Sequence, residues 1–274
     1  EFRRVLFRST NNSEYELLTS NSMTGLTISA PFLLLDMNDA NSVVSYLKDQ
    51  GYETVGMHCG EKSNYGRNAA YPAIGFDHVY LGETDFDYYS KFGNRPWLDI
   101  DNYRDMLEAY NDCSEGPRFV YLLTYQNHGG YDQNEAEFDS ISIKEDLGEY
   151  TDEVNEYLSS IEMSAEAFRE LTEYFSMEDR KAVILMVGDH APSFISSIPV
   201  RSENMGLLEN IALRTVPYFI WSNFELNGKM LSDRSSMVDL VPMMLKSAGF
   251  PLTSYYKKRV NHFFCGMSVG ASSK

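Results

Sequence analysis

Acidic and imidazole side chains directly follow three segments that the sequence predicts to be β-strands. Asp189 and His190 come after one of these segments, and His128 and His58 come after the other two. Ligands of open parallel sheets bind at the carboxyl ends of the strands, and a carboxylate beside an imidazole is a common pair of metal ligands. We therefore expect Asp189 and His190 to bind a metal ion, with the other two histidines nearby. The alternative is that Asp189 caps the turn and His190 only packs.

A hydroxyl group near the start of the chain is a second candidate for chemistry. Thr10 precedes a segment with the pattern of a capping box, in which Asn11 would be the N-cap residue and Glu14 the N3 residue. A helix should therefore begin just after Thr10. The free N–H groups and the dipole of a helix N-terminus favour a bound phosphate or an alkoxide. Thr10 is thus a candidate nucleophile for phosphoryl transfer, and the alternative is that it only caps the helix.

The elements that must position these side chains alternate between strand and helix. Such alternation is typical of an α/β fold with a largely parallel central sheet and helices on both faces. The strand before Asp189 is a continuous aliphatic run, as expected for a central strand that is buried on both faces. Strands are predicted over 52–57, 118–125, 182–187 and 215–221, and helices over 41–50, 101–111, 145–175 and 237–248.

Composition narrows the classes of function. The chain of 274 residues has 40 acidic and 23 basic residues and a formal net charge of −17, so the backbone of a nucleic acid would be repelled. Its three cysteines show no C-x-x-C spacing, which indicates neither a zinc ribbon nor a disulfide framework. The apolar runs are far shorter than the roughly 20 residues that cross a bilayer. We expect a soluble fragment with no nucleic-acid partner.

Five segments of the chain carry motifs in a defined order. They are Thr10–Thr19, Met57–Asp77, Thr124–His128, Gly188–His190, and the pair Val216–Trp221 and Met237–Pro242. Over roughly residues 10–254 these segments resemble the lipoteichoic acid synthase and phosphoglycerol transferase family, which belongs to the alkaline phosphatase and sulfatase superfamily. Each motif alone is a weak signal, and it is the order and spacing of all five that carry the resemblance.

The resemblance implies a catalytic centre with one divalent cation. Thr10, Asp189 and His190 would hold the cation, and Mn²⁺ or Mg²⁺ suits this oxygen-rich set, with Zn²⁺ as an alternative. Thr10 would attack the phosphate of phosphatidylglycerol, release diacylglycerol and carry glycerophosphate as a covalent intermediate. A hydroxyl group of the acceptor, a glycerol-phosphate polymer or a glycolipid or glycan, would then displace the threonine.

The resemblance also implies how the substrate is bound. Arg67 would hold the phosphate oxygens, while His58 and His128 would hydrogen-bond the glycerophosphate and assist proton transfer to the leaving group. In the family, membrane helices precede the catalytic domain, which works on the extracellular face of the bacterial cell membrane. Those helices are absent from this sequence, so the full-length protein would be membrane-anchored and contact the membrane through them.

The two ends of the chain depart from the family. Residues 1–9 carry three arginines without a clear structural pattern, which indicates a non-native leader, and residues 255–274 form a tail of uncertain origin. In the family a metal-binding glutamate ends a first strand upstream of the threonine, and residues 10–254 would form a catalytic domain that lacks this strand. We therefore expect weak metal binding and low or no activity of this chain by itself.

Two other classes of function stay open. A phosphoethanolamine transferase or another lipid phosphotransferase or sulfatase would share the fold and the metal loop. Sulfatases need a modified Cys or Ser in a C/S-x-P-x-R context; no cysteine of this sequence stands in that context, and Ser197 is the one serine that does. An inactive surface-binding domain without a full metal site is the alternative outside enzymes.

Overall fold

The computed structural model describes residues 3–6, 9–38, 40–82, 85, 98–131, 140–198, 215–227 and 234–269. Its strands are β1 (Arg3–Leu6), β2 (Glu53–His58), β3 (His78–Leu81), β4 (Arg118–Leu123), β5 (Val183–Val187), β6 (Thr215–Ser222) and β7 (Arg234–Ser236). Its helices are α1 (Thr10–Thr19), α2 (Pro31–Leu34), α3 (Val43–Asp49), α4 (Arg67–Ile74), α5 (Asp99–Asp112), α6 (Thr151–Met177), α8 (Met237–Ser247) and α9 (Ser254–Val269), with 3-10 turns η1 (Asn64–Gly66), η3 (Gly148–Tyr150) and η4 (Ser193–Ser196).

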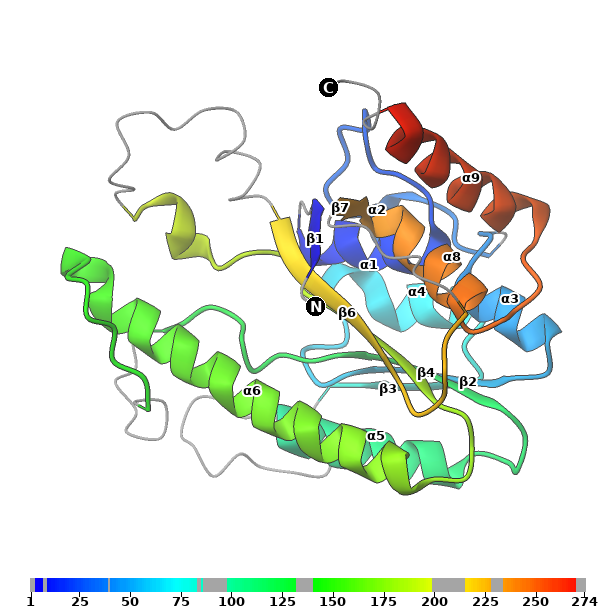
Figure 1. Ribbon diagram of the computed structural model, residues 1–274, viewed down its shortest axis with the longest axis horizontal. Helices are drawn as coiled ribbons and strands as arrows, with labels where there is room; N and C mark the ends of the chain where they lie inside the picture. The colour runs from blue at the N-terminus through cyan, green and yellow to red at the C-terminus, as the bar shows by residue number, and fades with distance from the viewer. Residues whose placement is uncertain are drawn as a thin grey trace.

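The described strands form two sheets that helices cover on both faces. In the sheet of order β3-β2-β4, β2 runs parallel to both of its neighbours. In the sheet of order β5-β6-β1-β7, β6 is antiparallel to β5 and β1, while β1 is parallel to β7. Figure 1 shows α5 and α6 on one side of the strands and α1, α3, α4 and α8 on the other. The predicted α/β fold with helices on both faces of the strands is confirmed.

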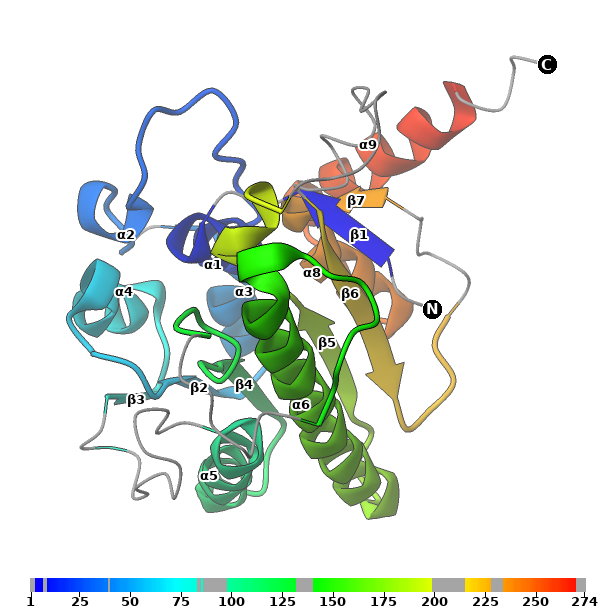
Figure 2. The same cartoon turned by 90° about the vertical axis from the view of Figure 1, so that its left-hand side faces the viewer.

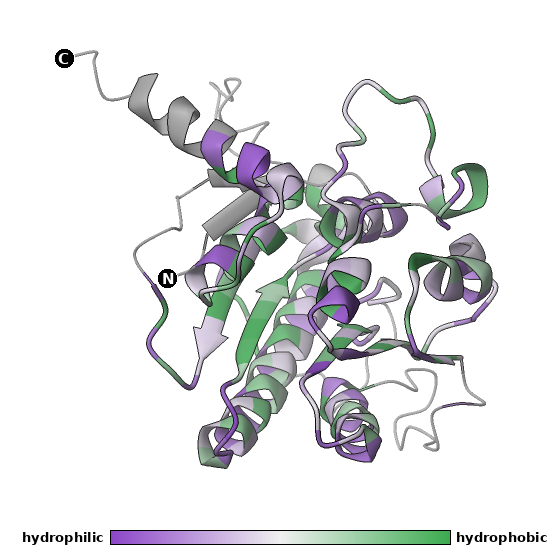
Figure 3. Ribbon diagram, turned by 90° about the vertical axis from the view of Figure 1, so that its right-hand side faces the viewer, coloured by the Kyte–Doolittle hydropathy of each residue, from purple (hydrophilic) through white to green (hydrophobic). Residues whose placement is uncertain are grey.

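Most of the core lies in two apolar layers that the strands separate, and a smaller cluster packs between β6 and α8. Along β4, Phe119 and Tyr121 pack against the layer under α1, α3, α4 and α8, whereas Val120 and Leu122 pack against the layer under α5 and α6. This alternation follows from the strand geometry, because successive side chains point to opposite faces. In Figure 3 the hydrophobic colour accordingly gathers on the strands at the centre of the molecule. The strands therefore hold their carboxyl ends rigidly, and these ends carry the candidate residues.

Most of the predicted elements are present, with one difference in burial. The predicted strand over 182–187 is β5, but its residues are only half-buried and not buried on both faces. Among the described strands β5 pairs with β6 alone, so its other edge lacks a ladder partner and stays partly exposed. Among the described residues, no helix combines the length and the apolar character that a membrane span requires.

The two ends of the chain are more regular than expected. The structure contains a strand before Thr10, since β1 pairs with β6 and β7, as Figure 2 shows. The expectation that residues 1–9 have no regular structure was therefore wrong for residues 3–6, while their non-native origin stays a prediction. At the other end, α9 crosses the expected boundary at 254 and packs on α8. Tyr256 in α9 is buried, and Tyr255 Oη donates to Ser20 O at 2.8 Å.

Candidate active site

Thr10, Asp189 and His190 meet where the N-terminus of α1 faces the carboxyl end of β5. The Thr10 hydroxyl donates to Asp189 Oδ2 at 2.7 Å, and His190 Nε2 lies 3.1 Å from Thr10 Oγ1. His190 Nε2 also lies 3.3 Å from Asp189 Oδ2. Residues separated by about 180 positions in the sequence thus converge at one point. The expected meeting of the nucleophile and the acid–imidazole pair is present in the structure, whereas their roles stay proposals.

The spacing of this cluster suits a cation. His190 Nδ1 lies 2.9 Å from Ala191 O, a pure acceptor, so Nδ1 donates this hydrogen bond and the ring turns Nε2 toward Thr10. The Thr10 hydroxyl donates to Asp189. Three electron-rich atoms spaced by 2.7, 3.1 and 3.3 Å match neighbouring ligands of one ion held at about 2.1 Å.

The set of candidate metal ligands is small. Among the described residues, no three His, Cys, Asp or Glu side chains cluster in a way that could hold a metal ion. The candidates are therefore one carboxylate, one imidazole and one hydroxyl. The residues fit a divalent cation, and their oxygen-rich chemistry favours Mn²⁺ or Mg²⁺ over a thiolate-type zinc site.

A serine on the first turn of α1 fixes the helix against the loop that contains Asp189 and His190. Ser13 Oγ donates to Asp189 O at 2.7 Å, and Asp189 Oδ1 accepts from the His190 N–H at 2.8 Å. The predicted capping box is wrong, because α1 begins at Thr10 itself, after Ser9, and Asn11 lies inside the helix. The Ser-to-carbonyl link could not be predicted, because its acceptor lies 176 residues away in the chain.

Arg67 is the first residue of α4 and lies buried beside α1. Its Nη2 lies 2.6 Å from Glu14 Oε2, and the two side chains are 2% and 1% exposed. Burial by itself would lower the pKa of Arg67, but the charge of Glu14 and its hydrogen bonds, together with the nearby Tyr71 and Tyr121, outweigh burial and raise the pKa. The Tyr65 ring lies over the guanidinium, with its centroid 5.2 Å from Cζ. Glu14, predicted as a capping residue, is instead the ion-pair partner of the proposed phosphate ligand.

His58 is a neutral, buried imidazole at the end of β2. Its Nδ1 donates to Leu123 O at 3.0 Å, in keeping with the register that pairs these two residues. Burial, together with the nearby charges of Arg67 and His128, lowers the pKa of His58 to about 4. His58 therefore presents the lone pair of Nε2 at neutral pH and acts there as a hydrogen-bond acceptor.

His128 lies in the exposed loop after β4, and an aromatic ring connects it to His58. The His128 and Tyr125 rings stack with centroids 4.6 Å apart, and the Tyr125 ring lies 6.0 Å from that of His58. The backbone of this loop is held from α6, because Asn127 Nδ2 donates to Ser164 Oγ at 2.7 Å. The structure thus brings His58 and His128 to one edge of the sheet, as the strand pattern predicts.

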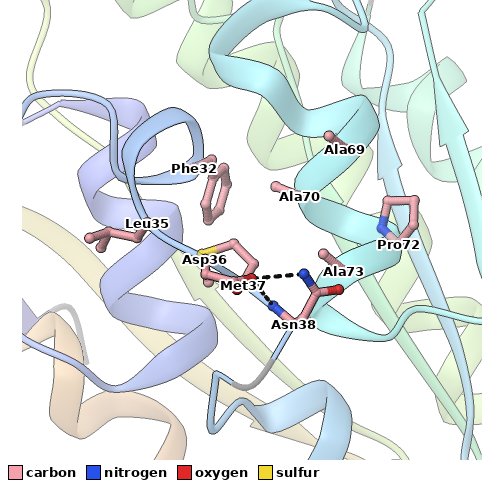
Figure 4. Close-up of a pocket in the computed structure, with 9 residues that line it drawn as sticks. All are labelled: Phe32, Leu35, Asp36, Met37, Asn38, Ala69, Ala70, Pro72 and Ala73. Atoms are coloured by element: carbon pink, nitrogen blue, oxygen red, sulfur yellow. Dashed lines mark hydrogen bonds between the residues drawn. The ribbon is translucent and has the colours of Figure 1, made fainter.

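Two further features lie outside this group of residues. Figure 4 shows a cavity of about 500 Å³ between α4 and the segment after α2. None of the residues that line it belongs to the predicted site; they are Phe32, Leu35, Asp36, Met37, Asn38, Ala69, Ala70, Pro72 and Ala73. Cys59 follows His58 directly but is fully buried, and burial raises the pKa of its thiol, so it is a structural residue and not a nucleophile.

Known proteins share this arrangement of elements. The structure of the phosphoglycerol transferase GacH from Streptococcus pyogenes, in complex with sn-glycerol-1-phosphate, superposes with a TM-score of 0.75. It is 18% identical and the match covers 95% of this chain and 69% of that chain. Lipoteichoic acid synthase 2 of Bacillus subtilis (strain 168) is 23% identical over 256 residues, or 89% of this chain and 38% of its own length.

A third similar protein has a name that refers to a glucan. A Rhizobium meliloti (strain 1021) protein named for cyclic beta-1,2-glucan modification is 26% identical over 267 residues, which cover 93% of this chain and 41% of the relative. The chain thus spans about two fifths of the length of these curated relatives. The sulfatase family model matches residues 2–250. With its fold of the alkaline-phosphatase type and a family match over most of its length, the chain belongs to the sulfatase family.

Proposed function

We propose that this chain is the catalytic region of a metal-dependent phosphoglycerol transferase. The observation that carries the proposal is the Thr10 hydroxyl, which lies at a helix N-terminus between Asp189 Oδ2 at 2.7 Å and His190 Nε2 at 3.1 Å. A hydroxyl in this position can lose its proton to the carboxylate, and the helix N-terminus stabilises the resulting anionic centre. The similarity to a phosphoglycerol transferase and a lipoteichoic acid synthase supports glycerophosphate as the transferred group.

The chain's own residues account for the first half of the reaction. Thr10 Oγ1 attacks the phosphorus atom of phosphatidylglycerol, its proton passes to Asp189, and the bond to the diacylglycerol oxygen breaks. Glycerophosphate is then esterified to Thr10. A divalent cation held by Thr10, Asp189 and His190 supplies Lewis-acid stabilisation of negative charge when it is bound.

The remaining residues bind the substrate and move protons. Arg67 donates to the phosphate oxygens, and His58, which is neutral because burial lowers its pKa to about 4, accepts a hydrogen bond from a glycerol hydroxyl. His128 is exposed and can exchange protons with solvent, so it serves the leaving group and then the incoming hydroxyl. That hydroxyl attacks the phosphorus atom, takes the glycerophosphate and releases Thr10.

The acceptor is a hydroxyl-bearing polymer, glycolipid or glycan at the cell envelope. The name of the lipoteichoic acid synthase favours a glycerophosphate polymer, and that of the Rhizobium meliloti relative favours a glucan. The full-length protein would work at the extracellular face of the bacterial cell membrane, where the lipid donor is present.

The test is a transfer assay on the full-length protein with Mn²⁺ and fluorescent phosphatidylglycerol, followed by mass spectrometry of the peptide that contains Thr10. We expect a glycerophosphoryl group on this peptide and none after Thr10→Ala. Thr19→Ala, at the other end of the same helix, is the matched control and should be labelled like the parent. Turnover of Thr10→Ala at the parental rate would refute the nucleophile, and a preference for phosphatidylethanolamine would favour a phosphoethanolamine transferase.

A further inference from the structure

The ion pair between Glu14 and Arg67 occupies one particular edge of the guanidinium group. Arg67 Nε lies 3.1 Å from both carboxylate oxygens of Glu14, and Nη2 donates to Oε2 at 2.6 Å. Tyr71 Oη, one turn further along α4, donates to Oε1 at 2.7 Å. The Glu14 carboxylate is thus held from two turns of α4 and binds Arg67 from the side, through the edge formed by Nε and Nη2.

A guanidinium group has a second edge that can bind an anion. It carries five N–H groups in one plane, and two of its edges can donate two parallel hydrogen bonds to a carboxylate or a phosphate. In Arg67 the end edge is formed by Nη1 and Nη2. Apart from the bond of Nη2 to Glu14, its one contact among the described residues is a long one of 3.5 Å from Nη1 to Asn64 O. Because the group is planar, a carboxylate on the side edge determines the direction in which the end edge points.

The position of Glu14 on α1 indicates that the Glu14–Arg67 ion pair has a role other than stabilising the fold. A buried ion pair contributes little net stability, because the cost of removing both charges from water offsets their attraction. Glu14 lies one turn after Thr10 on α1, so the same rigid helix carries the proposed nucleophile and the partner of the proposed phosphate ligand. The relative placement of the two groups is therefore determined by helix geometry and not by a flexible side chain.

We propose that Glu14 is a positioning residue that holds the side edge of Arg67, so that the end edge is presented to a phosphate group of the substrate. This inference rests on the proposed function, in which Arg67 binds that phosphate. A simpler role, in which Glu14 only neutralises the charge of Arg67, leads to the opposite expectation. Without Glu14, an uncompensated arginine would attract phosphate more strongly.

The experiment measures binding of inorganic phosphate and of sn-glycerol-1-phosphate by calorimetry, with thermal unfolding of each variant. We expect Glu14→Gln, which removes the charge, and Glu14→Asp, which keeps the charge but shortens the side chain, to bind both anions more weakly. The loss should be roughly tenfold to a hundredfold, as for one charge-assisted hydrogen bond. Arg67→Lys should show a similar loss, because an ammonium group lacks the planar fork.

Two controls separate positioning from general damage. Glu16→Gln alters a carboxylate on the same helix that accepts from Met23 N at 2.7 Å, and it should bind phosphate like the parent. Tyr71→Phe removes only the hydroxyl that holds Glu14, so it keeps the fold if the Glu14 variants do not, and it should weaken binding several-fold. A fall of kcat/KM for the lipid donor in the two Glu14 variants and in Tyr71→Phe would be a second supporting result.

The outcomes distinguish this inference from the proposed function. Tighter phosphate binding in Glu14→Gln, or unchanged binding in Glu14→Asp and Tyr71→Phe, would overturn the positioning role even if the parent transfers glycerophosphate. A parent that binds neither anion would overturn it as well. Weaker binding in all three variants would support it, whereas a parent that binds both anions but transfers no glycerophosphate would count against the proposed transfer reaction and not against the positioning role.

Discussion

Asp99 provides a test of how burial changes the pKa of a carboxylate and the stability of the fold. It is the first residue of α5 and is fully buried, and neither of its carboxylate oxygens has a hydrogen-bond partner among the described residues. Burial raises its pKa from 3.8 to about 6, and the hydroxyls of Ser164 and Thr124 lie near enough to offset only part of that rise. At neutral pH the folded protein therefore holds a buried carboxylate that water would solvate better.

The size of this effect follows from the pKa shift. A rise of about two units corresponds to about 3 kcal/mol of destabilisation once the group is ionised in both states. Because the pKa of Asp99 is higher in the folded state than in the unfolded state, its contribution to stability is full below about pH 4. It is lost as the pH rises through about 6. Asp99→Asn, which stays neutral, should thus be more stable than the parent at high pH.

Urea unfolding at about pH 5 and about pH 8 would measure this. We expect the advantage of Asp99→Asn over the parent to grow by more than 1 kcal/mol between these two pH values, since about half of the total develops there. Asp101→Asn, on the same helix and partly exposed, is the matched control and should show no such growth. A difference between Asp99→Asn and the parent that does not change with pH would refute the reasoning.

The remaining predictions concern the histidine, the metal ligands and the core. In Gly60→Ala the new Cβ would lie 2.6 Å from His58 Nε2 and displace the ring, so turnover should fall strongly. Gly116→Ala is the control, because its new Cβ would lie 3.7 Å from the nearest atom, and its turnover should equal that of the parent. Calorimetry should show weak Mn²⁺ binding that Asp189→Asn abolishes. Micromolar or tighter affinity would overturn the expectation of weak binding, and an unchanged Asn variant would contradict the assignment of Asp189 as a ligand. Leu171→Ala, in the layer under α5 and α6, should cost about 2–5 kcal/mol in urea unfolding, and a loss below about 1 kcal/mol would show that this layer is not packed as described.

Local patterns determined the elements and the ends of the strands. The aliphatic run before Asp189 and the glycine after the helix of residues 43–49 are readable from a few neighbouring residues, because strand and helix periodicity are local properties. Parallel strands place their carboxyl ends at one edge, so the convergence of His58 and His128 was also predictable. The resemblance of five ordered segments then led to the sulfatase fold, which the structure and the comparisons confirm.

The tertiary structure alone decided which side chains act on each other. The capping-box pattern at Glu14 is a local signal, but a buried arginine 53 residues away in the sequence outcompetes the backbone for that carboxylate. A desolvated ion pair is strong where water is excluded, and no sequence window contains both partners. The same reason applies to Ser13 with Asp189 O, and to Asp99, whose raised pKa depends on how completely distant segments bury it. Burial and long-range pairing exist only after the chain has packed, and here they set the orientation and the charge of the site.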